Sequence, residues 1–230
     1  MGLEIDQLLL GRFGVFCYLV TEPRSREALV VDPGAEPRRI LMQICKREAR
    51  LRWIVCTHAH PDHVGAVAGI KSETGAPVVL HRKEARTMGR LSHRLLVRLM
   101  GGKPPPKPDL LVEDGDGLRI GSCKVRILHT PGHSPGGICL LAEGNLFSGD
   151  TLFVGGVGRT DLPGASWEQL CASLRQKILC LPGSTRLWPG HHYGSLPTSR
   201  LEEERIQNPF IREIIAVSGQ DSERSVSEKR

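Results

Sequence analysis

Short apolar runs alternate with amphipathic stretches along the first hundred residues of the chain. Runs rich in Val, Ile and Leu favour strands, whereas apolar residues spaced three or four positions apart favour helices. The predicted strands are LLLGRFGVFCYLV (8–20), EALVVD (27–32), RWIVCT (52–57) and APVVL (76–80), and the predicted helices are PRRILMQICKREA (37–49), VGAVAGIKSETG (64–75) and KEARTMGRLSHRLLVRLM (83–100). The proline-rich segment GGKPPPKP that follows is predicted to be a stiff loop.

The second half of the chain continues in the same style. Residues 116–130 predict a hairpin that turns at Gly121-Ser122, and residues 136–150 predict another that turns at Glu143-Gly144. A helix over 166–181 with a capping box of Ser166 and Gln169, a short strand over 185–190, and a helix over 200–216 interrupted before Pro209 complete the pattern. The two halves predict an α/β fold, a four-layer αββα sandwich of two mixed β-sheets with helices outside.

Length and composition place the chain among globular proteins. With 230 residues, of which 40% are hydrophobic, it can bury a substantial core. We expect a single domain over residues 1–217 and a disordered tail over residues 218–230, where charged residues and serines replace the apolar pattern.

The cysteines and the N-terminal residues indicate the compartment. There are seven cysteines, an odd number without a C-x-x-C pair, and most have apolar neighbours, as is typical of reduced thiols. The chain does not open with a basic segment followed by an apolar one, and it has no apolar run of membrane-spanning length. We therefore expect a cytoplasmic protein that does not bind a membrane.

One segment accounts for the excess of positive charge. The chain carries a net charge of +6, and eight Lys and Arg residues lie between Arg82 and Lys107 against a single acid, Glu84. Arginines recur every four residues there, which places them on one stripe of the predicted helix. A solvated helix face is the simpler interpretation, and attraction of an anionic substrate or partner is the alternative. His81 and His93, on or near this helix, are expected to be exposed.

The candidate chemistry begins with THAHPDH, residues 57–63, directly after a predicted strand. In an extended segment His58 and His60 point to the same side, and Asp62 and His63 can curl beneath them as the next helix begins. Imidazoles and a carboxylate are ligands that suit Zn, Mn or Fe. Further histidines or aspartates follow other predicted strands in VVDPG, TPGHSPGG, SGD and PGHHYG. Together these segments offer enough ligands for two metals.

This order of motifs resembles the metallo-β-lactamase superfamily over residues 5–215. The resemblance implies one metal bound by His58, His60 and His133, a second bound by Asp62, His63 and His191, and Asp150 bridging them. It also implies that Asp32 orients the histidine cluster without binding metal. Two divalent ions are expected, most simply Zn, with Fe or Mn as alternatives.

The remaining motifs narrow the resemblance. GVGRTDLPG and EEERIQNPF are most similar to short glyoxalase II-type hydroxyacylglutathione hydrolases. An aspartate at the SGD position, where true β-lactamases commonly use cysteine, argues against an antibiotic hydrolase. Glyoxalase II carries a longer C-terminal helical region that helps to hold glutathione, and only 39 residues follow His191, so the glutathione preference stays open. Arg159 is expected to contact a substrate anion or, equally, to bind Asp161, and His192 and Tyr193 are expected to line the pocket.

The expected reaction is hydrolysis of a small-molecule thioester, with a glutathione conjugate as one candidate. A water held by two metals has a lowered pKa and provides hydroxide at neutral pH, with Asp62 taking part in proton handling. A thiolate leaves more readily than an amine, which favours a thioester over an amide.

Two other functions use the same residues. A persulfide dioxygenase would bind one iron through His58, His133 and Asp150, a facial triad with open positions. An RNA-processing nuclease is not favoured, because the basic stripe lacks the interleaved aromatic residues that stack on bases, so we expect no nucleic-acid partner. The sequence does not indicate the acyl group or the oligomeric state.

Overall fold

The N-terminal half forms a six-stranded mixed sheet. A computed structural model describes residues 2–216 of the chain, so the tail expected at 218–230 lies outside the described residues. The strands, in their order across the sheet, are β1 (Glu4–Leu10), β2 (Val15–Thr21), β3 (Glu27–Val31), β4 (Arg50–Val55), β5 (Val78–His81) and β6 (Leu110–Val112). The first three strands pair antiparallel, and β3 to β6 pair in parallel.

The C-terminal half forms a second mixed sheet of six strands. Their order across the sheet is β14 (Ser199–Arg200), β13 (Arg186–Pro189), β10 (Asn145–Gly149), β9 (Ile138–Ala142), β8 (Cys123–His129) and β7 (Gly117–Ile120). Both predicted hairpins turn where expected, since Ile120 pairs with Cys123 and Ala142 with Asn145. Glu143 and Gly144 both have positive φ, as the tight turn requires. A separate small hairpin joins β11 (Leu152–Phe153) to β12 (Gly156–Val157).

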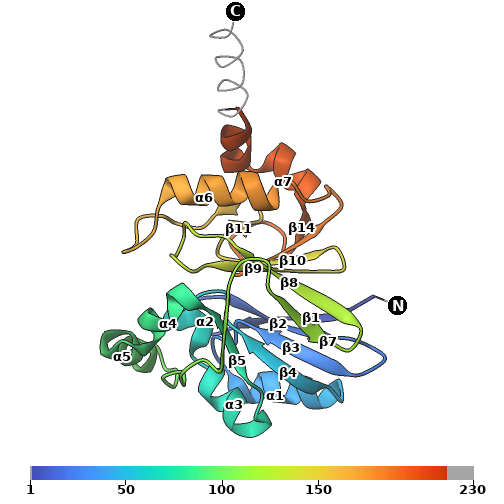
Figure 1. Cartoon of the computed structure of the whole chain (residues 1–230), viewed down its shortest axis with the longest axis vertical. Helices are drawn as coiled ribbons and strands as arrows, with labels where there is room; N and C mark the ends of the chain where they lie inside the picture. The colour runs from blue at the N-terminus through green and yellow to red at the C-terminus, as the bar shows by residue number, and fades with distance from the viewer. Residues whose placement is uncertain (1, 217–230) are drawn as a thin grey trace, which may run out of the picture.

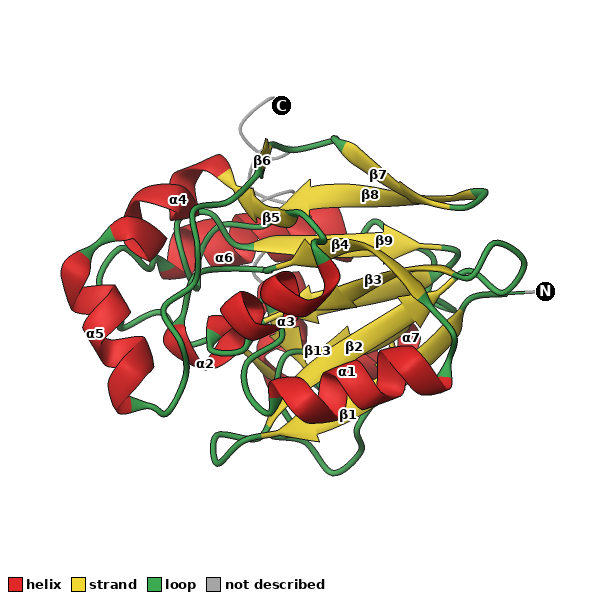
Figure 2. Cartoon of the chain, turned by 90° about the horizontal axis from the view of Figure 1, so that it is seen from below, coloured by secondary structure: helices red, strands yellow, loops and turns green. Residues whose placement is uncertain are grey.

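The two sheets pack face to face, and helices cover their outer faces (Figure 1). The first sheet is covered by α1 (Pro37–Lys46) and α3 (Val67–Thr74), which lie across it in Figure 2. The second is covered by α6 (Trp167–Ser173), its π-helical continuation (Leu174–Ile178) and α7 (Leu201–Gln207). Alternation along β2 explains the layering, because Phe16 and Tyr18 point into the core between the sheets while Cys17 and Leu19 point toward the helices. The predicted four-layer αββα sandwich is confirmed.

Five strands end at the same edge of the sandwich. In the first sheet β3 and β4 run in parallel, and in the second sheet β8, β10 and β13 share one direction. Backbone hydrogen bonds tie the two edges together, from Ile138 N to Thr57 O (2.9 Å) and from Phe16 N to Gly190 O (2.8 Å). Side chains that follow these five strands therefore meet, although they are far apart in the sequence.

Two predicted elements were wrong in their extent. The strand predicted over 8–20 is a hairpin, because Gly11 and Gly14 adopt positive φ and turn the chain between β1 and β2. The long basic helix is broken into α4 (Arg82–Gly89) and α5 (Leu91–Leu99), with Arg90 extended between them. Within residues 2–216, no helix is long and apolar enough to cross a membrane.

The expected exposure of two histidines was also wrong. His81 and His93 are both buried, because His81 stacks on His129 and His93 faces the loop after β4 rather than solvent. The break at Arg90 re-aims α5, so that His93 and Val97 pack inward while Leu91 and Leu99 remain exposed.

Candidate metal centre

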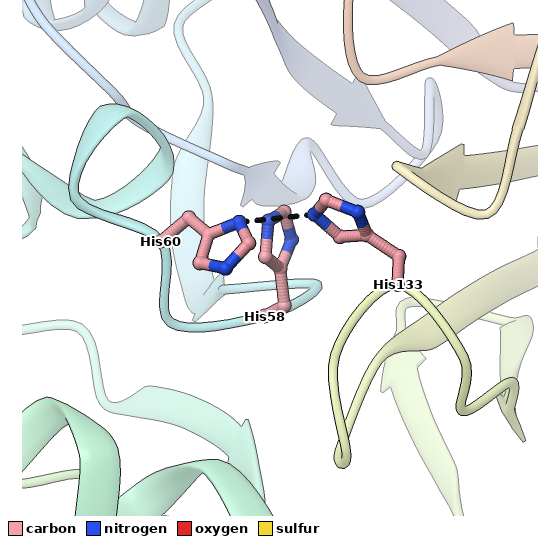
Figure 3. A group of neighbouring side chains, drawn as sticks. All are labelled: His58, His60 and His133. Atoms are coloured by element: carbon pink, nitrogen blue, oxygen red, sulfur yellow. Dashed lines mark hydrogen bonds between the residues drawn. The ribbon is translucent and has the colours of Figure 1, made fainter. Parts of the chain in front are cut away.

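Three histidines from two loops form a first triad. His58 and His60 lie in the loop between β4 and the short helix α2 (Pro61–Val64), and His133 lies in the loop after β8. Their ring nitrogens converge within 4.8 Å of one another (Figure 3), and His60 Nδ1 lies 2.9 Å from His133 Nε2. Three imidazoles at this spacing match the ligand set of a transition-metal ion.

A second triad lies beside the first. Asp62 and His63 are on α2, and His191 follows β13. Nε2 of His63 lies 3.2 Å from Nε2 of His191, which in turn lies 3.5 Å from the Asp62 carboxylate. The ligand atoms of this group also lie within 4.8 Å of one another.

Asp150 lies between the two triads. Its Oδ2 is 3.5 Å from His133 Nε2 and 3.6 Å from His191 Nε2, while its Oδ1 is 3.4 Å from His63 Nε2. A single carboxylate thus faces ligands of both groups, which is the arrangement of a residue that bridges two metal ions.

A buried hydrogen-bond network behind the triads starts at Asp32. Its Oδ2 accepts hydrogen bonds from Thr57 Oγ1 (2.7 Å) and from His63 Nδ1 (3.0 Å), and its Oδ1 accepts one from Thr57 N (2.7 Å). Because the Thr57 hydroxyl donates to Asp32, its oxygen accepts the proton of His58 Nδ1 at 3.0 Å. Asp32 therefore fixes the orientation of one histidine in each triad.

These outer hydrogen bonds decide which nitrogens face inward as acceptors. His133 Nδ1 donates to the carbonyl of Arg159 (2.9 Å), and His191 Nδ1 donates to the carbonyl of Phe13 (3.1 Å). With Nδ1 protonated, the inward Nε2 atoms of His58, His133 and His191 carry lone pairs, and a bound cation would take the place of the proton on His63 Nε2. Among the described residues, His58 Nε2 and Asp150 Oδ1 are buried without a hydrogen-bond partner. Unpaired buried acceptors and converging lone pairs fit bound cations, so the residues present suit a metal pair.

The ionisation of the cluster follows from burial and from three carboxylates. Burial, helped by neighbouring imidazoles, lowers the pKa of His60 to about 3 and those of His133 and His191 to about 4, which leaves these rings neutral. Burial opposes the charged form of His63 as well, but Asp150, Asp32 and Asp62 outweigh it and raise the His63 pKa to about 10. The carboxylates thus create a site that attracts positive charge.

Two glycines leave room for the segments that carry Asp62 and Asp150. A Cβ at Gly34 would lie 1.8 Å from the Asp62 carbonyl oxygen, and one at Gly190 would lie 2.3 Å from Asp150 Oδ1. Both contacts are far shorter than real Cβ contacts, so larger residues there would displace a ligand-bearing segment.

The rim of the centre is formed by the residues after His191 and by the β1–β2 turn. The Tyr193 ring stacks on His191, with centroids 4.7 Å apart and planes 5° from parallel, and its side chain is 67% exposed. His192 is exposed and packs against Phe16. A depression beside Asp62 is lined by Arg12, Phe13, Met100 and Gly102 among others.

The structure brings together all seven residues predicted to bind metal, with Asp32 behind them. Arg159, in contrast, directs its guanidinium to Asp161 in a bidentate pair at 2.6 and 2.7 Å and is 63% exposed. Thr57 and the Phe13 carbonyl, which orient ligands, were not predicted from the sequence. Neither was Arg12, an exposed cation at the rim that lies over the Phe13 ring and for which the described residues provide no ion pair.

Comparison with known proteins gives consistent matches. The family model for the metallo-beta-lactamase superfamily matches residues 10–191. The probable metallo-hydrolase YqgX of Bacillus subtilis is 37% identical over 188 residues, which are 80% of this chain and 87% of that protein. The human mitochondrial persulfide dioxygenase ETHE1 is 33% identical over 199 residues, 85% of this chain and 71% of that protein.

Solved structures match over nearly the same length. The structure of the BLEG-1 B3 metallo-beta-lactamase superposes with a TM-score of 0.82 at 33% identity, covering 90% of this chain and 99% of that chain. TTHA1623, solved in a di-iron-bound form, superposes with a TM-score of 0.78 at 37% identity, covering 89% of this chain and 99% of that chain.

Proposed function

This chain belongs to the metallo-beta-lactamase superfamily, whose members include metal-dependent hydrolases and dioxygenases, and from that premise we propose that it hydrolyses thioesters with two bound divalent ions. The position of Asp150 is the observation that carries the proposal. One carboxylate oxygen lies within 3.6 Å of a histidine from each triad, which supports a ligand set shared by two ions. The di-iron-bound form of TTHA1623 supports a two-metal site, and zinc is the ion that we expect.

Seven residues of the chain would bind the ions, and one of them, Asp62, would also transfer a proton. His58, His60 and His133 would hold one ion, Asp62, His63 and His191 the other, and Asp150 both. When bound, such a pair supplies a hydroxide nucleophile at neutral pH and polarises the scissile carbonyl. The Asp62 carboxylate, at the open side of the second triad with 21% of its side chain exposed, is placed to hold and pass on a proton.

The rim would hold the substrate. Tyr193 presents an exposed phenol next to His191. Arg12 presents an exposed cation over the Phe13 ring, at the depression that Asp62 also lines, and the described residues provide no ion pair for it. We propose Arg12 rather than Arg159 as the main contact for a substrate carboxylate, because Asp161 already neutralises the Arg159 guanidinium. A departing thiolate, with a free thiol pKa of about 8.5, needs no strong general acid. This rim suits an anionic thioester such as a hydroxyacyl conjugate of glutathione.

The experiment is a substrate panel with metal analysis. Protein loaded with zinc is offered a hydroxyacyl glutathione thioester, a coenzyme A thioester and a β-lactam, the last because of the likeness to BLEG-1. Two ions per chain with thiol release from a thioester is the expected result. Two bound ions without release of any thiol would overturn the thioesterase proposal.

A persulfide dioxygenase is the second candidate, favoured by the 33% identity to ETHE1 over 85% of this chain. In that case His58, His133 and Asp150 would hold a single iron. Oxygen uptake and sulfite formation from glutathione persulfide, with one iron per chain and no thiol release from thioesters, would establish this function instead.

A further inference from the structure

The peptide groups on both sides of Ala59 are held from outside the metal centre. Ala59 lies between the ligands His58 and His60 and is fully buried. Its N–H donates to Glu84 Oε2 at 3.2 Å, and its carbonyl accepts a hydrogen bond from His93 Nε2 at 2.5 Å. Glu84 comes from α4 and His93 from α5, so the helices of the basic segment fix the backbone of this ligand loop.

The Glu84 carboxylate also reaches the second ligand loop. Its other oxygen, Oε1, accepts a hydrogen bond from Gly136 N at 2.8 Å, in the loop that carries His133. Glu84 is only 2% exposed, and within the described residues its carboxylate accepts hydrogen bonds from these two backbone amides alone. One carboxylate thus joins the loop after β4 in the first sheet to the loop after β8 in the second.

The close approach of these parts depends on glycine. A Cβ at Gly136 would lie 2.8 Å from Glu84 Cγ and 2.9 Å from His81 Nδ1. The chain therefore has its smallest residue at the point where the His133 loop meets α4, so that the amide can reach the carboxylate.

We infer that Glu84 is a positioning residue for the first metal triad. Glu84 accepts one N–H from each ligand loop and so sets the distance between the His58–His60 pair and His133. Across this gap His60 Nδ1 lies 2.9 Å from His133 Nε2. Within residues 2–216, Glu84 makes no hydrogen bond or ion pair with the second triad, so we expect its effect to be confined to one of the two ions. The inference rests on metal binding, which the proposed function also requires, and not on the reaction that follows.

Replacement of Glu84 leaves other backbone hydrogen bonds that hold the two ligand loops. Between the loops, Ile138 N still donates to Thr57 O at 2.9 Å, and within the loop that carries His133, Thr130 N donates to Gly137 O at 2.8 Å. In Glu84→Gln the side chain keeps its shape, but its NH2 group faces a backbone N–H that it cannot accept. In Glu84→Ala both amides lose their acceptor. Glu84→Gln therefore removes one of the two hydrogen bonds, and Glu84→Ala removes both.

The test measures metal affinity in the full-length protein. Metal-free wild type, Glu84→Gln and Glu84→Ala are titrated with zinc against a chromophoric chelator, and His60→Ala marks which affinity belongs to the first triad. Glu84→Gln is expected to weaken the first site about tenfold and Glu84→Ala more, up to about a hundredfold, the range seen for residues that orient metal ligands. The affinity of the second site is expected to stay at the wild-type value.

Glu22→Gln is the matched control. Glu22 is also buried, at 6% exposure, and accepts N–H bonds from Arg24 (3.3 Å) and Ser25 (2.8 Å), but it lies in the β2–β3 turn away from the ligands. Unfolding of the metal-free variants reports any general loss of stability. Glu22→Gln is expected to bind zinc like the wild type. Unchanged zinc affinity in Glu84→Gln, or equal weakening of both of its sites, would overturn the inference. A wild type that binds no zinc would overturn the proposed function together with it.

Discussion

Asp32 accepts a hydrogen bond from His63 Nδ1 at 3.0 Å while its own backbone is in the left-handed region, with φ of 48°. Asparagine tolerates this backbone conformation, so Asp32→Asn tests the carboxylate without straining the chain. The amide of the variant would present an N–H group to Thr57 or His63, both of which are donors toward this side chain. We expect metal affinity to fall about 10- to 100-fold with little change in folding. Zinc titration and thermal unfolding measure the two effects, and unchanged affinity would show that Asp32 does not orient His63.

Asp150 should matter to both ions, whereas Asp62 should matter to one. Asp150→Asn removes the charge that faces His133 and His191, so both affinities should weaken and hydrolysis should fall at least about 100-fold, as when a group that stabilises charge in the reaction is lost. Asp62→Asn should weaken binding of the second ion only. Metal content after dialysis and initial rates distinguish the two variants. Equal loss of one ion in both would contradict the bridging position of Asp150.

Arg12 and Arg159 can be separated by kinetics. Arg12→Ala should raise KM for an anionic thioester about 5- to 20-fold with a small change in kcat, because a charge contact at the rim contributes to binding of substrate and transition state alike. Arg159→Ala should change KM less than twofold, as its charge is paired with Asp161. Steady-state rates at low and at 0.5 M added salt, roughly the range over which exposed charges become screened, complete the comparison. A larger effect from Arg159 would reverse the assignment.

His81 should make the protein sensitive to acid. Burial, together with His129, Lys83 and Arg82, lowers the His81 pKa to about 4, below the value of about 6.5 in an unfolded chain. The unfolded state therefore binds a proton first, so stability is complete above pH of about 6.5 and decreases as the pH falls toward 4. His81→Phe keeps a ring to stack on His129, which lies 4.0 Å away, but cannot be protonated.

The free energy of unfolding, measured with urea at several pH values, checks this expectation. Between pH of about 6.5 and 4 the wild type should lose up to about 1.4 kcal/mol per pH unit more than His81→Phe does. Metal-free protein is used for both, so that the ligand histidines titrate alike and cancel. Parallel pH curves for the two proteins would contradict the assignment.

The ligand residues could be predicted from sequence because each follows a strand that ends at one edge. His58 comes three residues after the end of β4 and Asp150 directly after the end of β10, as Asp32 behind them does after β3, and the apolar runs in these strands reveal where they end. The hairpin turns were equally accessible, since Gly121-Ser122 and Glu143-Gly144 are local signals. The break at Arg90 was harder to predict. Gly89, which ends α4, is a poor helix former, but the basic pattern runs on through Arg90, and the packing of His93 against the Ala59 loop is a tertiary contact.

The residues that orient the ligands could not be predicted from the sequence, for a different reason. Glu84 was visible as the single acid among eight bases, but its partners are backbone amides that no side-chain pattern reveals. Phe13 contributes only its carbonyl, which any residue would supply. Arg159 was recognised in the sequence, but its partner was left open between a substrate anion and Asp161. The choice could not be made from sequence, because the ion pair with Asp161 depends on side-chain conformations in a loop.

Each triad takes ligands from both halves of the sandwich, with His58 and His60 opposite His133, and Asp62 and His63 opposite His191. A bound ion would therefore act as a cross-link between two layers that otherwise meet through an apolar core and a few backbone hydrogen bonds. Neither half could unfold without releasing both ions, so metal would couple the halves into one cooperative unit. The free metal concentration around the protein would then set its resistance to proteolysis as well as its activity.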